Sequence, residues 1–351
     1  MTSKAFGLAQ LGNAYADGAL SNRNKIINGA MTIDQRNAGA AVTPTSNAQY
    51  VLDRWMPALS VASKYSVQRT AASAPIGFSH ATLITSLSAY SPLAADFLYY
   101  GHKIEGHNVA DLNWGTANAA KITVSFWVRS SLTGVFSVRL VNSGFDRSYV
   151  TTYTINSADT WEKKTITVSG DTSGTWDTTN GSGIELAFDL GSGSNWTTSS
   201  ANSWQAASNI KLTGSVSLLG TNGATWYVTG VQLEAGDTAT PFEHRSFGAE
   251  LALCQRYFQK HLSTGSIGFF GRGNMPGAGS SIPVPFTFPT VMRASPTVTI
   301  IGTWDVSNMG QPFSSGPNPS SPALVANSLG VGDGFVYTGS VGTGFSAAAE
   351  L

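Results

Sequence analysis

The sequence predicts a mainly β protein: an antiparallel β-sandwich of the jelly-roll type, followed by a short helix and a small C-terminal β domain, assembled as an oligomer. Two observations predict this fold class. Short segments with an apolar residue at every second position recur between clusters of Gly, Asn, Asp and Ser. Helical periodicity, in contrast, is convincing in one segment only. Short strands at this spacing, with hardly a helix among them, are typical of sandwiches and jelly rolls.

The alternation of apolar and polar residues places the strands of the sandwich. In KITVSFWVR (121–129) every second residue from Ile122 to Val128 is apolar, which predicts a strand with one buried face. Further strands are expected at residues 61–68, 136–140, 149–155, 161–168, 186–190, 210–218 and 225–234. We therefore place the jelly-roll domain at residues 25–245.

One segment has the spacing of a helix. Apolar residues lie three or four apart from Phe247 to Leu262, and Ser246 precedes them as an N-cap. We expect a helix over residues 246–262 that connects two domains. Cys254 lies on its apolar stripe, where a small buried hydrophobic side chain is a better interpretation than a nucleophile.

The two ends of the chain differ from the middle. Residues 1–24 have little apolar periodicity, which favours an extension that orders against a partner. Residues 263–351 form a Gly- and Pro-rich region with proline-broken strands, expected at sheet edges, and a long loop at 311–322. Because such a tail would bury little surface alone, we expect it to form an oligomerisation and tip domain with copies of itself.

Composition argues against several classes of partner. Only 11% of the 351 residues are charged, against about 25% in typical soluble proteins, and the formal net charge is zero. There is no basic field to attract phosphate backbones or anionic lipid, so we expect no nucleic-acid partner and no membrane insertion. One cysteine and five scattered histidines argue against a disulfide framework and a zinc site, and we expect no cofactor.

Three tryptophans lie in polar loops, where nothing demands a large apolar ring. Such a ring either plugs an end of the sandwich, or is buried between subunits, or offers its face to a sugar. Sugars present C–H faces that stack on indole, and neighbouring Asn, Asp or Arg side chains can bond their hydroxyls. The candidate glycan-binding residues are Trp176, Trp196, Trp204, Asn195, Asp177 and Arg147.

Two further groups of residues have structural interpretations. Asp53 and Arg54 precede Trp55, and an Asp/Arg pair beside an indole would hold the edge of a strand by charge-assisted hydrogen bonds and stacking. Glu234 and Glu243 flank a turn, where we expect them to cap backbone amides. A structural calcium ion is the alternative, although calcium needs six or more oxygen ligands.

The sequence lacks the recognisable motifs of an enzyme. It contains no G-x-S-x-G, H-E-x-x-H, Walker A or G-x-G-x-x-G motif. Glu185 and Asp189 share the face of their strand that points away from the core, where we expect solvent and no pocket to shift their pKa values. We therefore predict a binding protein without catalytic residues.

Several motifs together resemble a widespread group of phage tail-fibre and tail proteins. They are NKIINGAMTIDQR (24–36), YVLDRW (50–55), WYVTGVQLEAGDTATPFEHR (226–245), ELALCQRYFQK (250–260) and the ending AEL (349–351). The resemblance implies a carbohydrate-binding jelly roll and an oligomeric fibre on the virion, which we expect to be a homotrimer assembled in the host cytoplasm. Residues 1–24, which the motifs hardly cover, are expected to attach the chain to other virion proteins.

We favour a receptor-binding component of a tail fibre, which binds glycan on the host cell surface through a trimeric sandwich and tip. The alternatives are a structural virion protein without receptor binding, such as a head fibre, decoration or tail collar, a polysaccharide-degrading tailspike, and a secreted glycan-binding module. The choice of a phage protein rests on the motif resemblance, because a fold does not establish a function.

Overall fold

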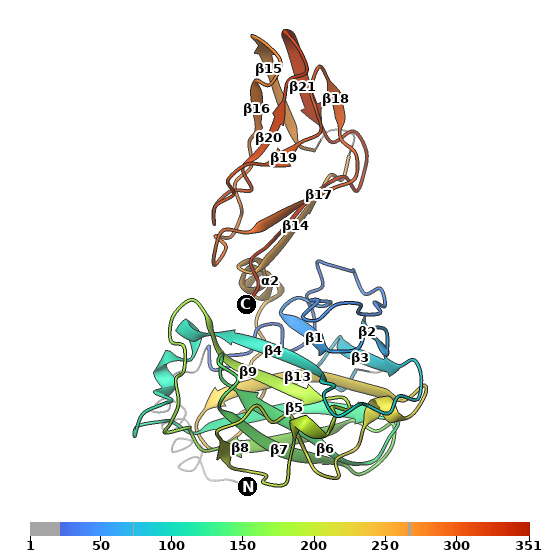
Figure 1. The fold of residues 1–351 in the computed structure, drawn as a ribbon, viewed down its shortest axis with the longest axis vertical. Helices are drawn as coiled ribbons and strands as arrows, with labels where there is room; N and C mark the ends of the chain where they lie inside the picture. Colours follow the sequence, from blue (N-terminus) through green and yellow to red (C-terminus); the bar gives the residue numbers. More distant parts are fainter. Residues whose placement is uncertain (1–21, 73, 266–267) are drawn as a thin grey trace. The chain divides into compact units, whose positions relative to one another are not determined.

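The computed structural model describes residues 22–72, 74–265 and 268–351, and the chain divides into two compact units between Phe247 and Gly248 (Figure 1). Most of the predicted attachment segment, residues 1–21, lies outside the described residues. No helix in the described part of the chain is long and apolar enough to cross a membrane.

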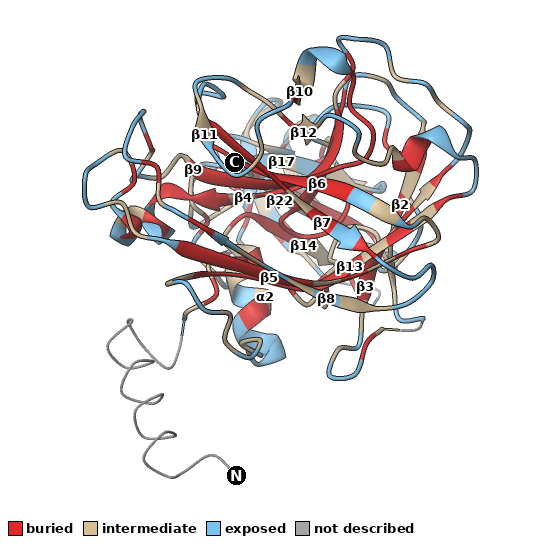
Figure 2. Ribbon diagram, turned by 90° about the horizontal axis from the view of Figure 1, so that it is seen from below, coloured by how far each residue is buried: buried red, intermediate tan, exposed pale blue. Residues whose placement is uncertain are grey.

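The N-terminal unit is a sandwich of two antiparallel β-sheets (Figures 1 and 2). The six-stranded sheet has the order β1 (Trp55–Leu59), β4 (Leu98–Glu105), β9 (Ser182–Asp189), β6 (Gly134–Val141), β7 (Ser148–Ile155) and β11 (Trp204–Gln205). The five-stranded sheet has the order β2 (Tyr65–Thr70), β3 (Ala81–Ser86), β13 (Thr225–Ala235), β5 (Ile122–Ser130) and β8 (Glu162–Val168). The connections contain a parallel pair, β10 (Thr197–Thr198) and β12 (Lys211–Leu212), and the 3-10 helices η1 (Gly106–Asn108), η2 (Ala110–Leu112), η3 (Ser194–Trp196) and η4 (Leu218–Gly220). The predicted mainly β, antiparallel sandwich is thus confirmed.

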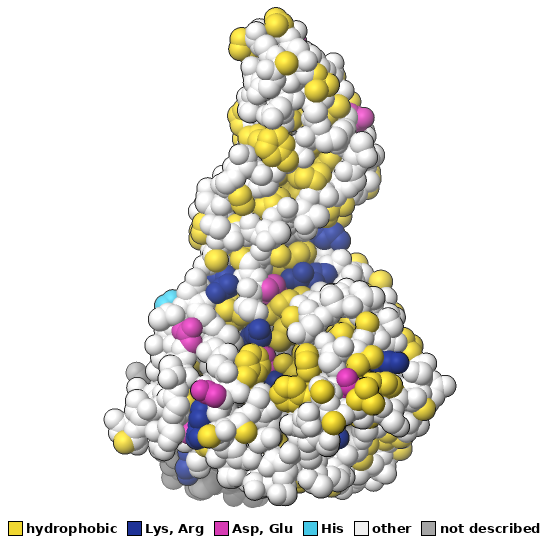
Figure 3. Space-filling model, viewed as in Figure 1, with side chains coloured by type: hydrophobic (Ala, Val, Ile, Leu, Met, Phe, Trp, Pro, Cys, Tyr) yellow, Lys and Arg dark blue, Asp and Glu magenta, His cyan; other side chains and the backbone are white. Residues whose placement is uncertain are grey.

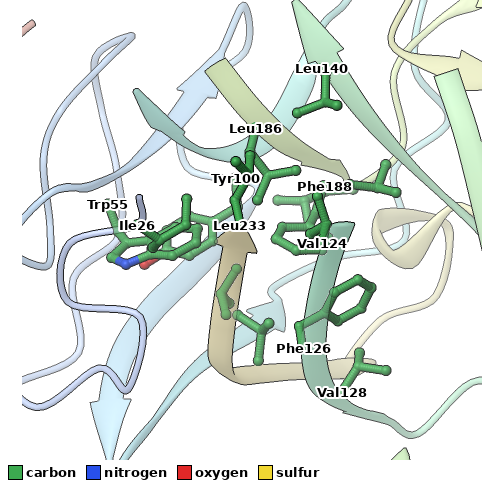
Figure 4. Packing of buried hydrophobic residues seen from close by; sticks show 14 of the residues in the cluster. Ile26, Trp55, Tyr100, Val124, Phe126, Val128, Leu140, Leu186, Phe188 and Leu233 are labelled. Carbon is green, nitrogen blue, oxygen red and sulfur yellow. The ribbon is translucent and has the colours of Figure 1, made fainter. Parts of the chain in front are cut away.

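The core of the sandwich lies between the two sheets. Phe126 of β5 and Phe188 of β9 come from different sheets, and their rings meet edge to face with centroids 5.1 Å apart. Figure 4 shows these rings among the side chains of Val124, Leu186 and Leu233. The period-two alternation of the sequence therefore produces the core directly, because every second residue of each strand points at the opposite sheet.

The segment before β13 differs from the prediction of a strand at 210–218. Only Lys211–Leu212 forms a strand there, and η4 begins at Leu218. The backbone N–H of Leu212 donates to the Ser137 hydroxyl oxygen (3.0 Å), and Gly214 turns the chain with a φ of +83°. The predicted strand was wrong beyond Leu212 because the chain turns at Gly214 instead of continuing in an extended conformation.

Residues 22–24 belong to the sandwich, which moves the predicted start of the domain from residue 25. The Asn24 side chain is buried, its Nδ2 donates to the Val231 carbonyl (3.0 Å), and its Oδ1 accepts from the Leu233 N–H (3.1 Å). These bonds fasten the entering chain along β13.

The predicted helix over residues 246–262 is shorter in the structure. Helix α2 spans Phe247–Gln255, whereas Phe258–Leu262 forms strand β14 and pairs with β22 (Gly344–Ala348). The prediction beyond Gln255 was wrong because the partner strand comes from the end of the chain, which local spacing does not reveal. Cys254 is buried, as predicted.

The C-terminal unit consists of three small antiparallel sheets. Their orders are β14–β22–β17 (Thr297–Ile301), β15 (Phe270–Met275)–β21 (Gly332–Tyr337)–β18 (Asp305–Ser307) and β16 (Ser281–Val284)–β20 (Leu324–Asn327)–β19 (Phe313–Ser314). Pro283 lies in the edge strand β16, as expected for a residue that cannot donate to a ladder. Strand β19 interrupts the predicted loop at 311–322.

This unit has a hydrophobic core of its own. Trp304 and Phe345 are fully buried in a cluster with Met292, Leu324 and Val336. A single copy therefore buries a hydrophobic core. The expectation that this region would bury little surface alone was wrong. Oligomerisation itself stays a prediction.

Candidate functional site

Two of the predicted sugar-stacking tryptophans, Trp176 and Trp204, pack against the core of the sandwich. Trp114 meets Trp176 and Trp204 edge to face, with ring centroids 4.8 and 5.2 Å apart. Trp176 and Trp204 also meet edge to face, with centroids 5.3 Å apart. Trp176 is only 9% exposed, and its Nε1 donates to the Ser173 carbonyl (3.1 Å), while Nε1 of Trp204 donates to the Ser169 carbonyl (2.7 Å). This arrangement matches the plug interpretation, because little of the Trp176 ring is available to a ligand.

The polar candidates near these rings hold loops in place. Arg147 donates two hydrogen bonds to Asp171, from Nε to Oδ2 and from Nη2 to Oδ1, both 2.7 Å. Asp177 Oδ1 accepts from the backbone N–H and the hydroxyl of Thr179, at 2.6 and 2.7 Å. Both sets of bonds are typical of loop and turn stabilisation.

The other two candidates lie in η3. The Trp196 ring packs against Phe97, with centroids 5.7 Å apart, and its Nε1 donates to the Ala95 carbonyl (2.9 Å). Asn195 is exposed, and its backbone N–H donates to the Ala94 carbonyl (2.9 Å). Trp196 packs in a cluster separate from that of Trp176 and Trp204, so the predicted residues are not brought together in one site. Sugar contact by Trp196 and Asn195 stays a prediction.

The outer face of the six-stranded sheet is covered, contrary to expectation. Glu185 and Asp189 point away from the core as predicted, but they are only 2% and 3% exposed. Residues 193–213, here called the cover segment, place Ile210 against Tyr99 on this face. The expectation of a solvated face was wrong. The alternation within β9 shows which side chains point away from the core, but it does not show that a later segment of the chain covers them.

The cover segment is tied to the sheet by serines of the strands beneath it. The Ser148 hydroxyl donates to the Ala207 carbonyl (2.6 Å) and accepts from the Asn209 N–H (3.1 Å). Burial raises the pKa of Asp189, although hydrogen bonds from Ser192 oppose the shift. Neither carboxylate of β9 is therefore exposed to a substrate in this arrangement.

Asp53 and Arg54 of the Asp53–Arg54–Trp55 motif bond to different segments of the chain, and the predicted pairing between them stays a prediction. Asp53 accepts from the backbone N–H and the side-chain amide of Gln35, both at 2.7 Å. Arg54 Nη2 donates to the Lys103 carbonyl (2.6 Å), and the fully buried Trp55 begins the edge strand β1. The motif thus holds the edge of the six-stranded sheet.

Glu234 and Glu243 accept hydrogen bonds from backbone amides. Glu234 Oε1 accepts from the Thr240 N–H (2.9 Å), and Glu243 Oε2 accepts from the Asn24 N–H (2.7 Å). Among the described residues there is no group of three or more His, Cys, Asp or Glu side chains that could hold a metal ion. The contacts of these carboxylates are those of structural caps.

A different surface combines exposed rings with polar groups. On the outer face of the five-stranded sheet, aromatic side chains from strands and loops form a partly exposed surface, here called the aromatic strip. It consists of Trp161, Tyr227, Trp127, Phe78 and Phe242.

Strand alternation places two of these rings. Trp127 lies between the buried Phe126 and Val128 of β5, and Tyr227 follows the buried Trp226 of β13. Both rings therefore face away from the core. The sequence therefore contains a signal for this surface: an aromatic residue stands at a strand position where the alternation leads one to expect a polar residue. The predicted sugar-binding rings, in contrast, lie in loops.

One end of the aromatic strip combines rings with charges. The rings of Trp161 and Tyr227 lie 6.0 Å apart between centroids at an angle of 66°. The guanidinium carbon of Arg129 lies 5.0 Å from the Tyr227 centroid, and Arg129 Nη2 lies 3.3 Å from Asp159 Oδ1.

The turn before Trp161 is held by Glu162. This carboxylate accepts from the backbone N–H groups of Asn156 (2.8 Å) and Ser157 (3.0 Å), and its Oε2 lies 2.6 Å from Lys164 Nζ. Desolvation opposes ionisation, but the hydrogen bonds to Lys164 and to residues 156–157 lower the pKa of Glu162 to about 2. Trp161 is thereby attached to a fixed turn.

The other end of the strip depends on a glycine. Gly230 has a φ of +60°, and a Cβ there would lie 2.6 Å from Phe78 Cζ and 3.1 Å from Trp127 Cδ1. Phe78 and Trp127 therefore both lie close to the backbone of Gly230, and the centroid of the Phe78 ring lies 5.0 Å from that of Phe242. The ladder between β13 and β5 shifts register at this point, as in a β-bulge.

The chemistry of this surface suits a ligand with apolar faces and polar edges. Figure 3 shows few charged side chains on the visible face of the protein. Rings exposed beside a few charged groups can stack on C–H faces and bond hydroxyls at the same time.

Comparisons with known proteins yield structural likenesses only. No protein-family model matches the sequence, and no curated protein matches it. A CBM4 structure aligns with 60% of this chain and 98% of its own at 14% identity and a TM-score of 0.32. The Family 11 carbohydrate-binding module from Clostridium thermocellum, in complex with a mixed-linked tetrasaccharide, aligns with 56% of this chain and 97% of its own at 12% identity and a TM-score of 0.29. The enzymatically active domain of bacteriophage CBA120 tailspike protein 4 aligns with 61% of this chain and 22% of its own at 11% identity and a TM-score of 0.31.

Proposed function

We propose that this chain is a non-catalytic virion protein of the tail-fibre kind that binds glycan on the host surface through the aromatic strip. The aromatic strip carries the proposal. Trp127, Tyr227 and Trp161 are partly exposed on the outer side of the five-stranded sheet, where a ligand or a partner can cover the exposed part of their rings.

Sugar is the occupant that fits the groups around the rings. Arg129 and Asp159 form a hydrogen-bonding pair at the edge of the ring surface, and Lys163 pairs with Trp127 in the ladder between β8 and β5. Pyranose rings offer apolar faces to the indoles and hydroxyls to these polar side chains.

The virion location is supported by the motifs that resemble phage tail-fibre and tail proteins. In this proposal residues 1–21 attach the chain to other virion proteins. The C-terminal unit exposes Leu329, Val331 and Val341 at 69%, 75% and 73%, and burial of these side chains between copies would stabilise a homotrimer.

Binding of the purified full-length chain to immobilised host-surface polysaccharides tests the proposal. Trp127→Ala and Trp161→Ala should each weaken binding about tenfold, which corresponds to about 1.4 kcal/mol. Phe247→Ala is the matched control, because Phe247 is 66% exposed and lies outside the aromatic strip. Absence of binding by the parent protein, or equal binding by all four proteins, would overturn the glycan site.

Two further measurements separate the alternatives. If Trp127→Ala dissociates an oligomer and leaves glycan binding unchanged, the aromatic strip is an interface between copies. Release of new reducing ends from the polysaccharide would contradict the non-catalytic assignment and favour a tailspike.

A further inference from the structure

The charges around the aromatic strip are unequal. At the end of the strip formed by Trp161, Tyr227 and Trp127, the polar groups include two cations, Arg129 and Lys163, and the carboxylate of Asp159, which lies against Arg129. The next carboxylate along the chain, Glu162, is bonded to Lys164 and to the backbone of its own turn. This end of the aromatic strip therefore carries one cation that no carboxylate compensates.

Lys163 is that cation. It is exposed, and its side chain forms neither an ion pair nor a hydrogen bond with any described residue. It stands opposite Trp127 in the antiparallel ladder of β5 and β8, where paired side chains on one face have Cβ atoms about 5 Å apart. A ligand ring that lies on Trp127 would thus place its substituents beside the Lys163 ammonium group.

We infer that the aromatic strip selects acidic saccharides, with the sugar ring on Trp127 and its anionic substituent paired with Lys163; this rests on the proposed glycan-binding function. Charge complementarity identifies the class of ligand. A uronate or a sulfated sugar offers a negative charge at the rim of the ring, whereas a neutral sugar leaves Lys163 without a partner. An amino sugar would bring a second positive charge to the same place.

The test is retention of the full-length protein on a panel of immobilised polysaccharides. The panel contains polygalacturonate and alginate, each also in methyl-esterified form, together with a sulfated galactan and neutral galactan and β-glucan. Esterification removes the carboxylate charge and keeps the sugar backbone, so it isolates the contribution of the anion. The sulfated arm shows whether the site requires a carboxylate or accepts either anion.

The expected result is retention on acidic polymers, with binding about fivefold weaker after esterification and about fivefold weaker for Lys163→Gln. Lys163→Arg should retain the preference, and added salt should reduce it, because exposed charges are screened. Lys121→Gln is the control, since Lys121 is an exposed lysine of the same unit that lies 3.9 Å from Asp237 and outside the aromatic strip.

The possible failures are distinct. Equal retention on neutral, esterified and acidic polymers, unchanged by Lys163→Gln, would overturn the acidic preference and leave the glycan-binding function standing. No retention on any polymer would overturn the proposed function and the preference with it.

Discussion

Arg139 of β6 and Glu185 of β9 form a buried ion pair on the outer face of the six-stranded sheet, with Nη2 and Oε1 3.0 Å apart. The side chains are 1% and 2% exposed, and the Arg139 guanidinium carbon lies 4.4 Å from the Tyr99 ring centroid. The cover segment excludes solvent from this pair. The pair's contribution to stability therefore depends on residues 193–213 staying in place on the sheet.

Removal of one partner of this pair should be costly. Arg139→Met leaves Glu185 buried without its cation, and such a change typically costs about 3–5 kcal/mol. The measurement is urea unfolding at neutral pH, with Lys121→Gln as an exposed-lysine control expected to change stability by less than about 1 kcal/mol. The double variant Arg139→Met/Glu185→Leu should recover part of the loss, and a single variant as stable as the parent would refute the prediction.

The lowered pKa of Glu162 should make its contribution to stability pH-dependent. Because its pKa falls from the ordinary value of 4.5 to about 2 on folding, the ionised carboxylate stabilises the protein above about pH 4.5. This contribution is lost as the pH falls from about 4.5 through about 2. Glu162→Gln should therefore unfold at lower urea concentration than the parent at pH 7, with the difference shrinking as the pH approaches 2. A difference that stays constant over this range would contradict the assignment.

The parts of the fold that depend on neighbouring residues could be predicted from the sequence. Phe126 and Phe188 were placed in the core by alternation alone, because the two-residue period of a strand is local. The bond from the Thr240 N–H to Glu234 is local to the turn that the two glutamates flank, whereas Glu243 bonds to the distant Asn24 N–H, which the local pattern does not show.

The parts that depend on distant segments could not. The outward direction of Glu185 was predicted, but its burial depends on Ile210 and the rest of the cover segment, which no local pattern links to β9. Likewise β14 interrupts the predicted helix because β22 supplies its partner. The candidate site was missed for another reason. The alternation of β5 does place Trp127 on the side of the strand away from the core, but the sugar-binding rings were sought in loops.

The Asn24 side chain should contribute more to the free energy of unfolding than its place near the start of the sequence suggests. It is 4% exposed and bonds to three buried backbone groups, of Ile26, Val231 and Leu233. Asn24→Leu removes these partners, and each unsatisfied buried group costs about 1–3 kcal/mol, so we expect a loss of at least about 2 kcal/mol in urea unfolding. Asn118→Leu, at an exposed position, is the control. Equal stability of the two variants would refute the role of Asn24.

His102 should make the sandwich less stable in mild acid. It is fully buried, with Nε2 3.0 Å from the Ile27 carbonyl oxygen, and its ring meets Trp55 edge to face at 5.0 Å. Desolvation, followed by the nearby Arg54, lowers the pKa of His102 well below its ordinary value of 6.5.

The sign of the effect follows from proton binding. The unfolded chain protonates this histidine near pH 6.5, whereas the folded chain does so only at much lower pH, so stability falls as the pH drops below 6.5. One such group contributes up to about 1.4 kcal/mol per pH unit.

We expect the parent to lose more stability between pH 7.5 and pH 5 than His102→Gln does, as measured by urea unfolding at each pH. His80→Gln is the control. Burial and the nearby Arg69 also lower the pKa of His80, but its side chain is partly exposed and lies outside the core. If His102→Gln keeps the full pH dependence of the parent, the buried imidazole is not the group that titrates.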